Sequence, residues 1–592
     1  MARNIKKEVQ KQKEVSYSNK DFKSLRNDLK RHMITHFSDN IVDFSDASMG
    51  GMLVDLGAYV GDVLTYYLDH QFNENNIETA VERTNLERLI REAGVKIPSA
   101  SPSYATVNLS IVVPAAVDAT GESAPIVNAL PTIKANSVFS SPAGVKFYLL
   151  EDVNFKDKDQ SGKLLAKQNV GVVSGNRIAN FVLTREGIVS SAKIKTEKFT
   201  ISDKLIPFRT ITLEEDNVNE IISVTDTLGD NYYEVDSLTQ DTVFRALDNT
   251  GYDKFSVSSR LEVLHAPKRF VKTRSIDSGK TTLRFGSGNE NNFDEDVIPD
   301  PSEHAIKLFG DRKTFPTVTI DPNSFLTTQT LGISPVNTTL TVNYRHGGGL
   351  THNVSAGDIN SVQTLITEFQ TSTPPSTEAF VRSSLTVFNR QPSSGGEDEP
   401  TIEELRNIAI FNRGSQNRIV TREDLIARVY SMPSNFGRVF RVSVSDNPRN
   451  PRGAELHVIS RDVASRLTTS TDTLKQNLAK YLNHFRLVSD AIDILDAPII
   501  NIGLKYSITV SKGFRQEVVS ASVNNKIKNY FNIKNMQINK PLIVTEIENI
   551  IINTPGVVSL VSFQIFGRSG FINGNAYSDF DYDVIQNYDR GF

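Results

Sequence analysis

The chain opens with helical periodicity. Between residues 46 and 71, apolar side chains recur at spacings of three and four, which predicts one long amphipathic helix. A second helix is expected over residues 76–93, with Asn75 as its N-cap, Glu78 at its third position and Gly94 after its end.

Glycines interrupt the first predicted helix. Gly57 and Gly61 lie one turn apart, so this face lacks side chains and another backbone can approach it closely. Each interior glycine costs about 1 kcal/mol relative to alanine. Two interpretations are equally supported: contact with a partner subunit, or packing within the chain against the next helix.

From residue 104 to 345 the pattern changes to short β-branched and aromatic runs separated by turn residues, which indicates one or two antiparallel β domains. A helix is expected over residues 357–379, and residues 390–400 (RQPSSGGEDEP) resemble a linker or an ordered loop. Flexible joints are expected near residues 98–103 and 390–400.

Helices and strands alternate after residue 400. Thr401 with Glu404, and Thr421 with Asp424, have the spacing of capping boxes. Predicted helices cover residues 401–411, 421–431, 472–486, 515–531 and 543–553. A faint duplication, a Val-Thr pair followed by an apolar helix, a proline and a strand, fits two stacked modules of ferredoxin-like type.

These patterns predict a multidomain α+β protein with an N-terminal helical domain, central antiparallel β domains and C-terminal ferredoxin-like α/β modules. The expected boundaries are a helical domain at 1–97, β-rich domains at 98–345, a connecting segment at 346–400, a first α+β module at 401–495 and a second at 496–592.

Composition narrows the functional classes. The 592 residues are 39% hydrophobic and carry a formal net charge of −4, which is globular and gives no case for binding nucleic acid or an acidic membrane. Residues 1–31 hold ten Lys and Arg against four Asp and Glu, yet no aromatic stacking platform follows, so a solvated arm is favoured over a nucleic-acid contact. The absence of cysteine excludes disulfides, zinc–thiolate sites and cysteine nucleophiles. No signal peptide or membrane-spanning run is expected.

Candidate catalytic and metal motifs are all incomplete. Residues 346–349 (HGGG) match an oxyanion-hole signature, but no G-x-S-x-G nucleophile motif occurs. Residues 286–288 (GSG) lack the third glycine of a dinucleotide loop. His32 and His36 lack the intervening Glu of a zinc protease, and the Asp-rich runs near 157–162 and 579–583 lack the final Glu of a calcium loop. We therefore expect no enzyme activity, no cofactor and no metal site.

Several short segments occur together in a characteristic order: 284–288 (RFGSG), 344–349 (YRHGGG), 395–398 (GGED), 403–406 (EELR), 418–425 (RIVTREDL), 432–433 (MP), and 547–552 followed by 554–557 (TPGV). In this order they resemble the Baseplate J-like family. Residues 50–69 resemble the start of the larger baseplate wedge subunit of T-even-type contractile-tailed phages. The chain departs from the family pattern after Met432-Pro433, where Pro-Gly-Val is usual, and at Asp424-Leu425, where Asp-Tyr is commoner.

The resemblance implies a structural role in the virion tail baseplate, after assembly in the host cytoplasm. Such a subunit forms a homodimer within a wedge, binds other wedge proteins, and joins neighbouring wedges into a ring around the hub. Rearrangement of this ring triggers sheath contraction. The expected interface residues are Met52, Leu53, Leu56, Gly57, Val60, Gly61, Leu64, Leu405, Arg418, Thr421, Asp424 and Leu425.

Three alternatives remain. The same fold would suit the baseplate of a tailocin or another contractile injection system. A carbohydrate-binding tail protein is less consistent with a chain that has no Trp. A hydrolase built around His346 would need a nucleophile that the sequence does not supply.

Overall fold

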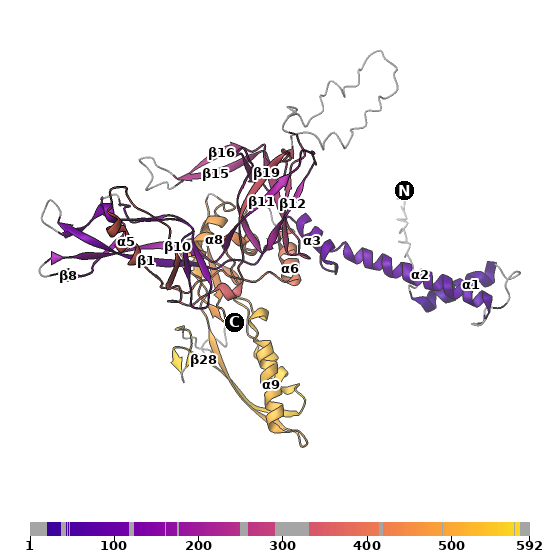
Figure 1. Ribbon diagram of the computed structural model, residues 1–592. Helices are drawn as coiled ribbons and strands as arrows, with labels where there is room; N and C mark the ends of the chain where they lie inside the picture. Colours follow the sequence, from indigo (N-terminus) through magenta and orange to yellow (C-terminus); the bar gives the residue numbers. More distant parts are fainter. Residues whose placement is uncertain are drawn as a thin grey trace, which may run out of the picture. The chain divides into compact units, whose positions relative to one another are not determined.

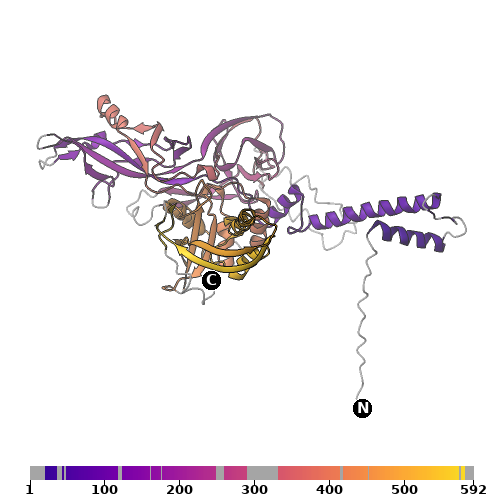
Figure 2. The same cartoon turned by 90° about the horizontal axis from the view of Figure 1, so that it is seen from below.

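The computed structural model divides into two compact units, residues 1–92 and 93–592, which are described separately (Figures 1 and 2). The structure describes residues 21–36, 43, 45, 48–117, 123–159, 162–174, 177–248, 259–289, 331–413, 418–450, 452–487, 489–572 and 575–580.

The described residues of the first unit form three helices. They are α1 (Phe22–His36), α2 (Met49–Glu74) and α3 (Arg83–Glu92). The prediction of a long helix near 46–71 is confirmed by α2, whose N-cap Ser48 accepts a hydrogen bond of 3.0 Å from the Gly51 N–H. Helices α1 and α2 lie side by side in both views.

The predicted start of the second helix is wrong. Asn75 is the C-cap of α2, and α3 begins only at Arg83. The buried carboxylate of Glu74 accepts hydrogen bonds from the backbone N–H groups of Val81 (2.8 Å) and Glu82 (3.2 Å). A carboxylate from the end of α2 therefore accepts hydrogen bonds from the backbone N–H groups just before α3. The sequence pattern had predicted that these residues lie inside a helix.

An eight-stranded sheet forms the first part of the second unit. Its long central pair is antiparallel, with Tyr104 opposite Ser190 and Pro114 opposite Asn180. Alternate residues of the first strand, from Val107 to Val113, are almost fully buried in the core. The sheet order is β2-β1-β10-β5-β4-β20, with β22 paired to β1 and β7 to β10. The strands are β1 (Tyr104–Val117), β2 (Ser123–Pro125), β4 (Val138–Ser140), β5 (Lys146–Leu149), β7 (Lys167–Val170), β10 (Asn180–Ser190), β20 (Ser361–Thr364) and β22 (Thr386–Asn389).

A seven-stranded sheet follows, in the order β11-β19-β13-β14-β17-β18-β12. Its core includes Phe285, Leu340 and Tyr344, each fully buried. The expected antiparallel pairing is confirmed except between β14 and β17, which run parallel. The strands are β11 (Lys193–Ile201), β12 (Thr210–Asp216), β13 (Val218–Thr225), β14 (Asn231–Glu234), β17 (Arg269–Arg274), β18 (Lys280–Phe285) and β19 (Thr338–His346).

Smaller strands and turns complete this region. The strands are β3 (Thr132–Ile133), β6 (Val153–Asn154), β8 (Val173–Ser174), β9 (Arg177–Ile178), β15 (Thr242–Asp248), β16 (Ser259–His265) and β21 (Thr367–Glu368). Short 3₁₀ helices cover Val127–Ala129, Leu350–His352, Ser434–Phe436 and Ile533–Asn535.

The helix predicted over 357–379 is wrong. This stretch holds β20 and β21, and the helix α5 (Pro375–Ser383) begins near its end. Ser361 pairs with Ser140 of β4, so pairing with a distant strand overrides the local pattern. The segment 346–400, expected only to connect, thus adds β20 and β22 to the first sheet.

The remaining residues form two α+β modules. The first contains α6 (Ile402–Arg413), α7 (Arg422–Tyr430), β23 (Arg441–Asp446), β24 (Gly453–Arg461), β25 (Leu467–Thr468), α8 (Asp472–Leu482) and β26 (Ala491–Asp496). The second contains β27 (Asn501–Val510), α9 (Gln516–Tyr530), α10 (Val544–Ile552), β28 (Val557–Arg568), β29 (Phe571–Ile572) and β30 (Asn575–Ala576).

Both predicted capping boxes are present. Thr421 accepts from the Asp424 N–H at 3.1 Å while the Asp424 carboxylate accepts from the Thr421 N–H at 3.0 Å, and Thr401 and Glu404 make the same exchange. The ferredoxin-like assignment is not confirmed. The sheet of the first module has four strands with β24 parallel to β26, and in the second module β27 pairs with β28 and β29 with β30.

Candidate partner interface

Helix α2 exposes a continuous row of apolar side chains. Met52 is 66% exposed, Leu53 53%, Leu56 60%, Val60 48% and Leu64 57%. At about 100° per residue these positions fall on one side of the helix. We call this row the α2 stripe; Met49 and Tyr67 extend it at its two ends. Single exposed apolar residues are ordinary, whereas a contiguous row of this length is typical of a protein–protein contact.

The glycine face of α2 lies against α1 of the same chain. A Cβ atom added at Gly57 would lie 3.3 Å from Leu29 Cδ1, and one added at Gly61 would lie 3.3 Å from Leu25 Cδ1. Arg26 of α1 also pairs with Asp55 of α2 at 2.5 Å. Of the two interpretations of these glycines, packing within the chain therefore fits the structure, although the neighbour is the preceding helix.

The C-terminal residues expected at an interface serve the first α+β module from within. Leu405 and Leu425 are each 2% exposed, so their side chains face the interior. Thr421 and Asp424 form the capping box of α7, and hydrogen bonds from the backbone N–H groups of Thr421 and Val420 hold the pKa of Asp424 below its usual value despite burial. Arg418 and Thr421 are the exposed members of this group.

Two motif segments that are far apart in sequence meet in the second unit. The Leu350 N–H donates to Asp398 Oδ1 at 3.0 Å, and the Gly396 N–H donates to Asn353 Oδ1 at 3.0 Å. Ser101 links them, because its N–H donates to the Glu397 carbonyl (2.9 Å) and its carbonyl accepts from Gly349 (3.0 Å). We call this contact of Ser101 with residues 346–353 and 395–398 the glycine junction.

Glycine is required at the centre of this junction. Gly348 has a φ of 132°, and a Cβ atom there would lie 2.5 Å from the Ser101 carbonyl oxygen. The HGGG sequence thus allows close backbone approach, which supports the interpretation as a structural turn.

A buried ion pair joins the glycine junction to the first α+β module. Arg461 Nε donates to Glu397 Oε1 at 3.2 Å, and Arg461 Nη2 bonds the second carboxylate oxygen. The guanidinium groups of Arg461 and Arg441 each lie 4.3 Å from the ring centroid of Phe440. Arg441 also donates to the Lys534 carbonyl at 3.0 Å, so this cluster connects both C-terminal modules.

The two segments expected as flexible joints pair with each other, and residues 98–103 and 393–397 are buried. The Tyr104 N–H donates to the Ser394 carbonyl at 2.8 Å, and the Ser394 N–H returns a bond of 3.0 Å. Ser103 and Ser393 are joined through their hydroxyl groups at 2.8 Å. The segment 390–400 is thus an ordered loop, the second of the two predicted possibilities.

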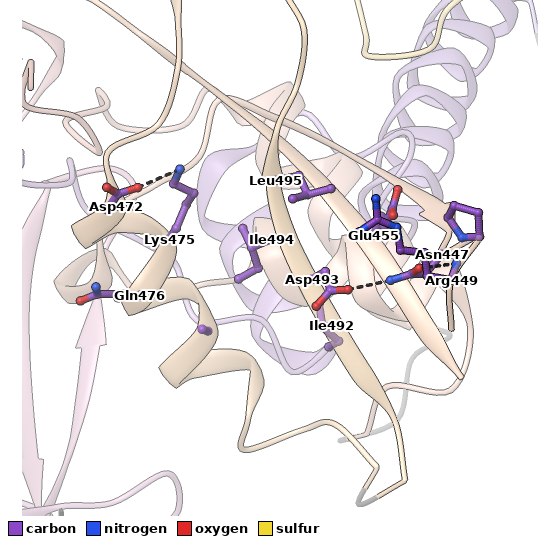
Figure 3. A pocket seen from close by; sticks show the side chains of 12 residues that line it. Asn447, Arg449, Glu455, Asp472, Lys475, Gln476, Ile492, Asp493, Ile494 and Leu495 are labelled. Atoms are coloured by element: carbon purple, nitrogen blue, oxygen red, sulfur yellow. Dashed lines mark hydrogen bonds and ion pairs between the residues drawn. The ribbon is translucent and has the colours of Figure 1, made fainter. Parts of the chain in front are cut away.

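A groove of about 820 Å³ lies along β26 (Figure 3). On one side stands α8 with Lys475 and Gln476, and on the other the turn with Asn447 and Arg449. Its floor is formed by four consecutive strand residues, 492–495.

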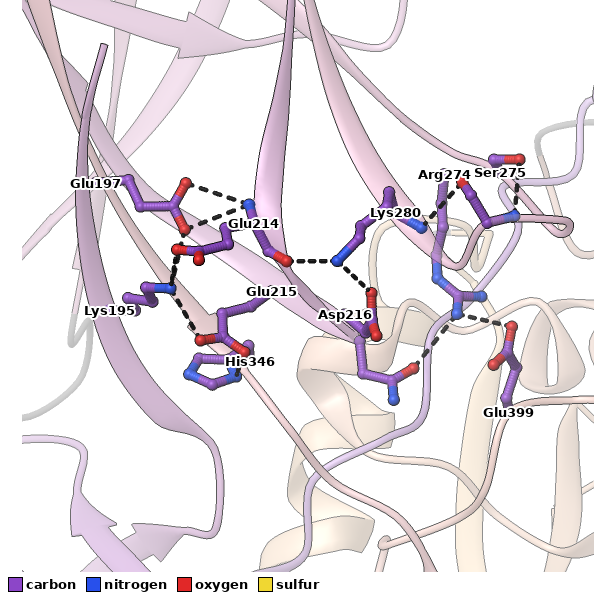
Figure 4. Close-up of polar contacts among 12 residues, drawn as sticks. Lys195, Glu197, Glu214, Glu215, Asp216, Arg274, Ser275, Lys280, His346 and Glu399 are labelled. Atoms are coloured by element: carbon purple, nitrogen blue, oxygen red, sulfur yellow. Dashed lines mark hydrogen bonds and ion pairs between the residues drawn. The ribbon is translucent and has the colours of Figure 1, made fainter.

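The surroundings of His346 are those of a structural cluster (Figure 4). Lys195 Nζ contacts Glu214 at 2.7 Å, Glu215 at 2.9 Å and Glu197 at 3.3 Å, while His346 Nδ1 lies 3.7 Å from Glu215. Burial lowers the pKa of His346, which favours the neutral imidazole at neutral pH. These contacts link β11, β12 and β19.

The aspartates near 157–162, considered as a calcium loop, make contacts with neighbouring residues of the chain. Asp157 pairs with Arg185 at 3.3 Å, and Asp159 accepts from the Lys163 N–H at 2.9 Å. Within the described ranges, no group of three or more His, Asp or Glu side chains is placed to hold a metal ion. Asp581 and Asp583, predicted as part of a second Asp-rich loop, lie outside the described residues. None of the described helices is both long and apolar enough to cross a membrane.

The sequence prediction did not reach all of the exposed apolar surface of α2. Tyr59 and Phe72 are 60% and 80% exposed but were not among the chosen interface residues. The signal for Tyr59 was its helical spacing, three residues after Leu56 and seven after Met52, whereas Phe72 lies off this repeat.

Comparison with known proteins gives a match for the first unit. Residues 22–92, which span α1 to α3, match the family model described as Bacteriophage baseplate protein, N-terminal domain. No curated protein matches the chain. Among solved structures, a chain of the structure described as "Cryo-EM structure of the anti-feeding prophage (AFP) baseplate, 6-fold symmetrised" aligns at 10% identity. The alignment covers 91% of this chain and 86% of that chain with a TM-score of 0.28. The domain match supports a baseplate protein with a structural role.

Proposed function

We propose that the chain is a wedge subunit of a contractile phage tail baseplate, of the Baseplate J-like kind. In this role it dimerises within a wedge, binds other wedge proteins and links neighbouring wedges into the ring around the hub. Rearrangement of that ring releases sheath contraction. The observation that carries the proposal is the match of residues 22–92 to a baseplate N-terminal domain.

The α2 stripe supports the bundle part of this role. Helix α1 covers the glycine face of α2, while the stripe stays exposed along the helix. Burying one Leu or Met side chain contributes about 1.5–3 kcal/mol, so a row of such residues supplies a large association energy. The partner we assign to it is a helix of another wedge protein or of the second copy.

The C-terminal modules are assigned to the ring contacts. Leu405 and Leu425 support these modules from inside, and the capping box of Thr421 and Asp424 fixes the start of α7. Arg418 and Thr421, both exposed just before α7, are the members of this group that we assign to contact with a neighbour.

Genetic complementation tests the proposal. Phages lacking the gene would be supplied with wild-type protein, Leu56→Glu or Asn27→Glu. Asn27→Glu is the matched control, because it adds the same charge at an exposed polar position of α1. We expect complete baseplates with wild type and Asn27→Glu and none with Leu56→Glu, as seen by electron microscopy. Normal baseplates from Leu56→Glu would refute the bundle contact, and normal tails without the protein would refute the baseplate role.

A further inference from the structure

Two histidines lie in the 346–353 segment of the glycine junction, on either side of its three glycines. His346 is the last residue of β19, and His352 ends the short 3₁₀ helix after the glycines. The side chain of His346 is 14% exposed, and His352 is also partly buried. Histidine is the residue whose ordinary pKa lies closest to neutral pH, so buried histidines at a contact between segments can make that contact sensitive to acid.

The imidazole of His352 ends a chain of hydrogen bonds that suits its neutral form. The Ser103 N–H donates to the buried Ser191 Oγ at 2.9 Å, and Ser191 Oγ lies 3.0 Å from His352 Nδ1. A neutral ring can accept the Ser191 hydroxyl proton at Nδ1. Protonation makes Nδ1 a donor, so the Ser191 hydroxyl loses its acceptor in the interior.

The imidazole of His346 also suits a neutral form. Nδ1 lies 3.7 Å from Glu215, whereas Nε2 is buried and has no hydrogen-bond partner among the described residues. A neutral ring can leave Nε2 without a proton. Protonation would place an N–H donor there with no acceptor, which costs free energy in a buried site.

The charges around His346 do not remove this cost. On the β13 side, the residue opposite His346 is the uncharged Val218. The charged side chains of the surrounding cluster are Lys193, Lys195 and Glu197 of β11 and Glu214 and Glu215 of β12 (Figure 4). The two lysines oppose a positive ring, and all three glutamates already contact Lys195.

We propose that the glycine junction is a pH-sensitive switch, which opens when His346 and His352 become protonated. Opening separates Ser101 from Gly349 and Glu397, whose backbone groups it binds in the closed form. The junction lies where β1 begins, where β19 ends and next to β24, so opening loosens the contact between both large sheets and the first α+β module. The proposal does not depend on the baseplate role, since it needs only contacts within one chain.

The direction of the pH response follows from burial. Burial lowers the pKa of both histidines below the ordinary 6.5, and for His352 no charged side chain of the described residues adds to this effect. The closed form is therefore favoured above that pH. As pH falls below it, the open form binds protons that the closed form does not. Each histidine then favours the open form by up to about tenfold per pH unit.

Thiol labelling of Ser101→Cys tests the switch in the full-length protein. Ser101 is fully buried, its hydroxyl has no hydrogen-bond partner among the described residues, and the chain has no cysteine of its own. The probe is dithiodipyridine, which reacts with thiols in mild acid. Each rate is divided by that of Leu228→Cys, an 82% exposed site, which removes the pH dependence of the thiol and the reagent. We expect this ratio to rise at least about tenfold from about pH 7.5 to about pH 5.5.

Val523→Cys is the matched buried control. Val523 is fully buried in the separate core of the second α+β module. Its labelling ratio should stay constant over the same pH range. An equal rise at Val523→Cys and Ser101→Cys would mean general acid unfolding and would overturn the proposal, as would no rise at Ser101→Cys.

The histidines themselves are tested in the Ser101→Cys background by His346→Gln combined with His352→Gln. A glutamine amide can accept a hydrogen bond from Ser191 but does not titrate. We expect the labelling ratio in acid to stay at its neutral-pH value, with circular dichroism at neutral pH verifying the fold. If the double variant does not fold, His352→Gln alone should remove about half of the rise on a logarithmic scale. A full rise without the histidines would overturn the proposal.

Discussion

The side chain of Asn353 holds both backbone groups of Gly396. Asn353 Nδ2 donates to the Gly396 carbonyl at 2.9 Å, and the Gly396 N–H donates to Asn353 Oδ1 at 3.0 Å. The same amide donates to the Arg461 carbonyl at 2.8 Å. The side chain of Asn353 therefore connects the 346–353 segment, to which it belongs, with residues 395–398 (GGED) and with β24.

Substitution Asn353→Ala tests this relationship. It leaves buried backbone groups of Gly396 and Arg461 without partners, and each such loss costs about 1–3 kcal/mol. We expect a total destabilisation of about 2–4 kcal/mol by chemical denaturation. Asn360→Ala is the control, since Asn360 is exposed and makes one long bond of 3.3 Å to Gly357. Equal effects of the two substitutions would contradict the role given to Asn353.

The ion pair of Glu397 and Arg461 should behave as a buried pair. Their side chains are 7% and 12% exposed, so removing one partner strands a charge in the interior. We expect Glu397→Gln to cost about 3 kcal/mol, at the low end for a broken buried pair because the amide keeps one hydrogen bond. The exposed pair of Arg466 and Asp462 provides the comparison, where Asp462→Asn should cost less than about 1 kcal/mol.

The packing of α1 on α2 depends on Gly57. A leucine side chain there would meet Leu29, which already lies 3.3 Å from the position of a Cβ atom. Overpacking of this kind costs about 1–3 kcal/mol, so Gly57→Leu should release α1. Hydrogen exchange of α1 amides should accelerate in Gly57→Leu and stay unchanged in Tyr59→Leu, an exposed site on the same helix. If the α1 amides stay protected in both variants, α1 does not pack against the glycine face of α2.

Glu74 should make the first unit sensitive to acid. Hydrogen bonds from the Val81 and Glu82 N–H groups and from Asn85 lower its pKa below the ordinary 4.5. A lowered folded-state pKa stabilises the fold at pH values above the unfolded pKa, and this contribution is lost as pH falls through the folded pKa. The thermal stability difference between wild type and Glu74→Gln should thus be greatest near neutral pH and shrink below pH 4.5. A stability difference that does not change with pH would contradict this stabilising role of the Glu74 carboxylate.

Local signals in the sequence predicted the elements that depend on local structure. Helix α2, both capping boxes and the strands of the long β1–β10 pair follow from periodicity and capping residues a few positions apart. The late start of α3 was missed because Glu74, outside the helix, supplies the capping carboxylate. The strand β20 was missed because its partner, β4, lies more than two hundred residues earlier in the chain.

The candidate interface was predictable only in part. The α2 stripe was predicted from its spacing, because an apolar row on one side of a helix has the same spacing whether that side is buried in the chain or exposed for a partner. The same spacing does not say which side faces solvent, so Gly57 and Gly61 were grouped with the stripe although α1 covers them. Leu405 and Leu425 were chosen by family resemblance, and only the folded chain reveals that their side chains face the interior.

The central claim is that the chain assembles with other baseplate wedge proteins. The most direct measurement is the mass of the purified protein by light scattering, alone and mixed with the other tail proteins of the same phage. We predict a dimer alone and a heavier complex with one or two of them, which Leu56→Glu abolishes. A monomer that gains no mass with any tail protein would contradict the account.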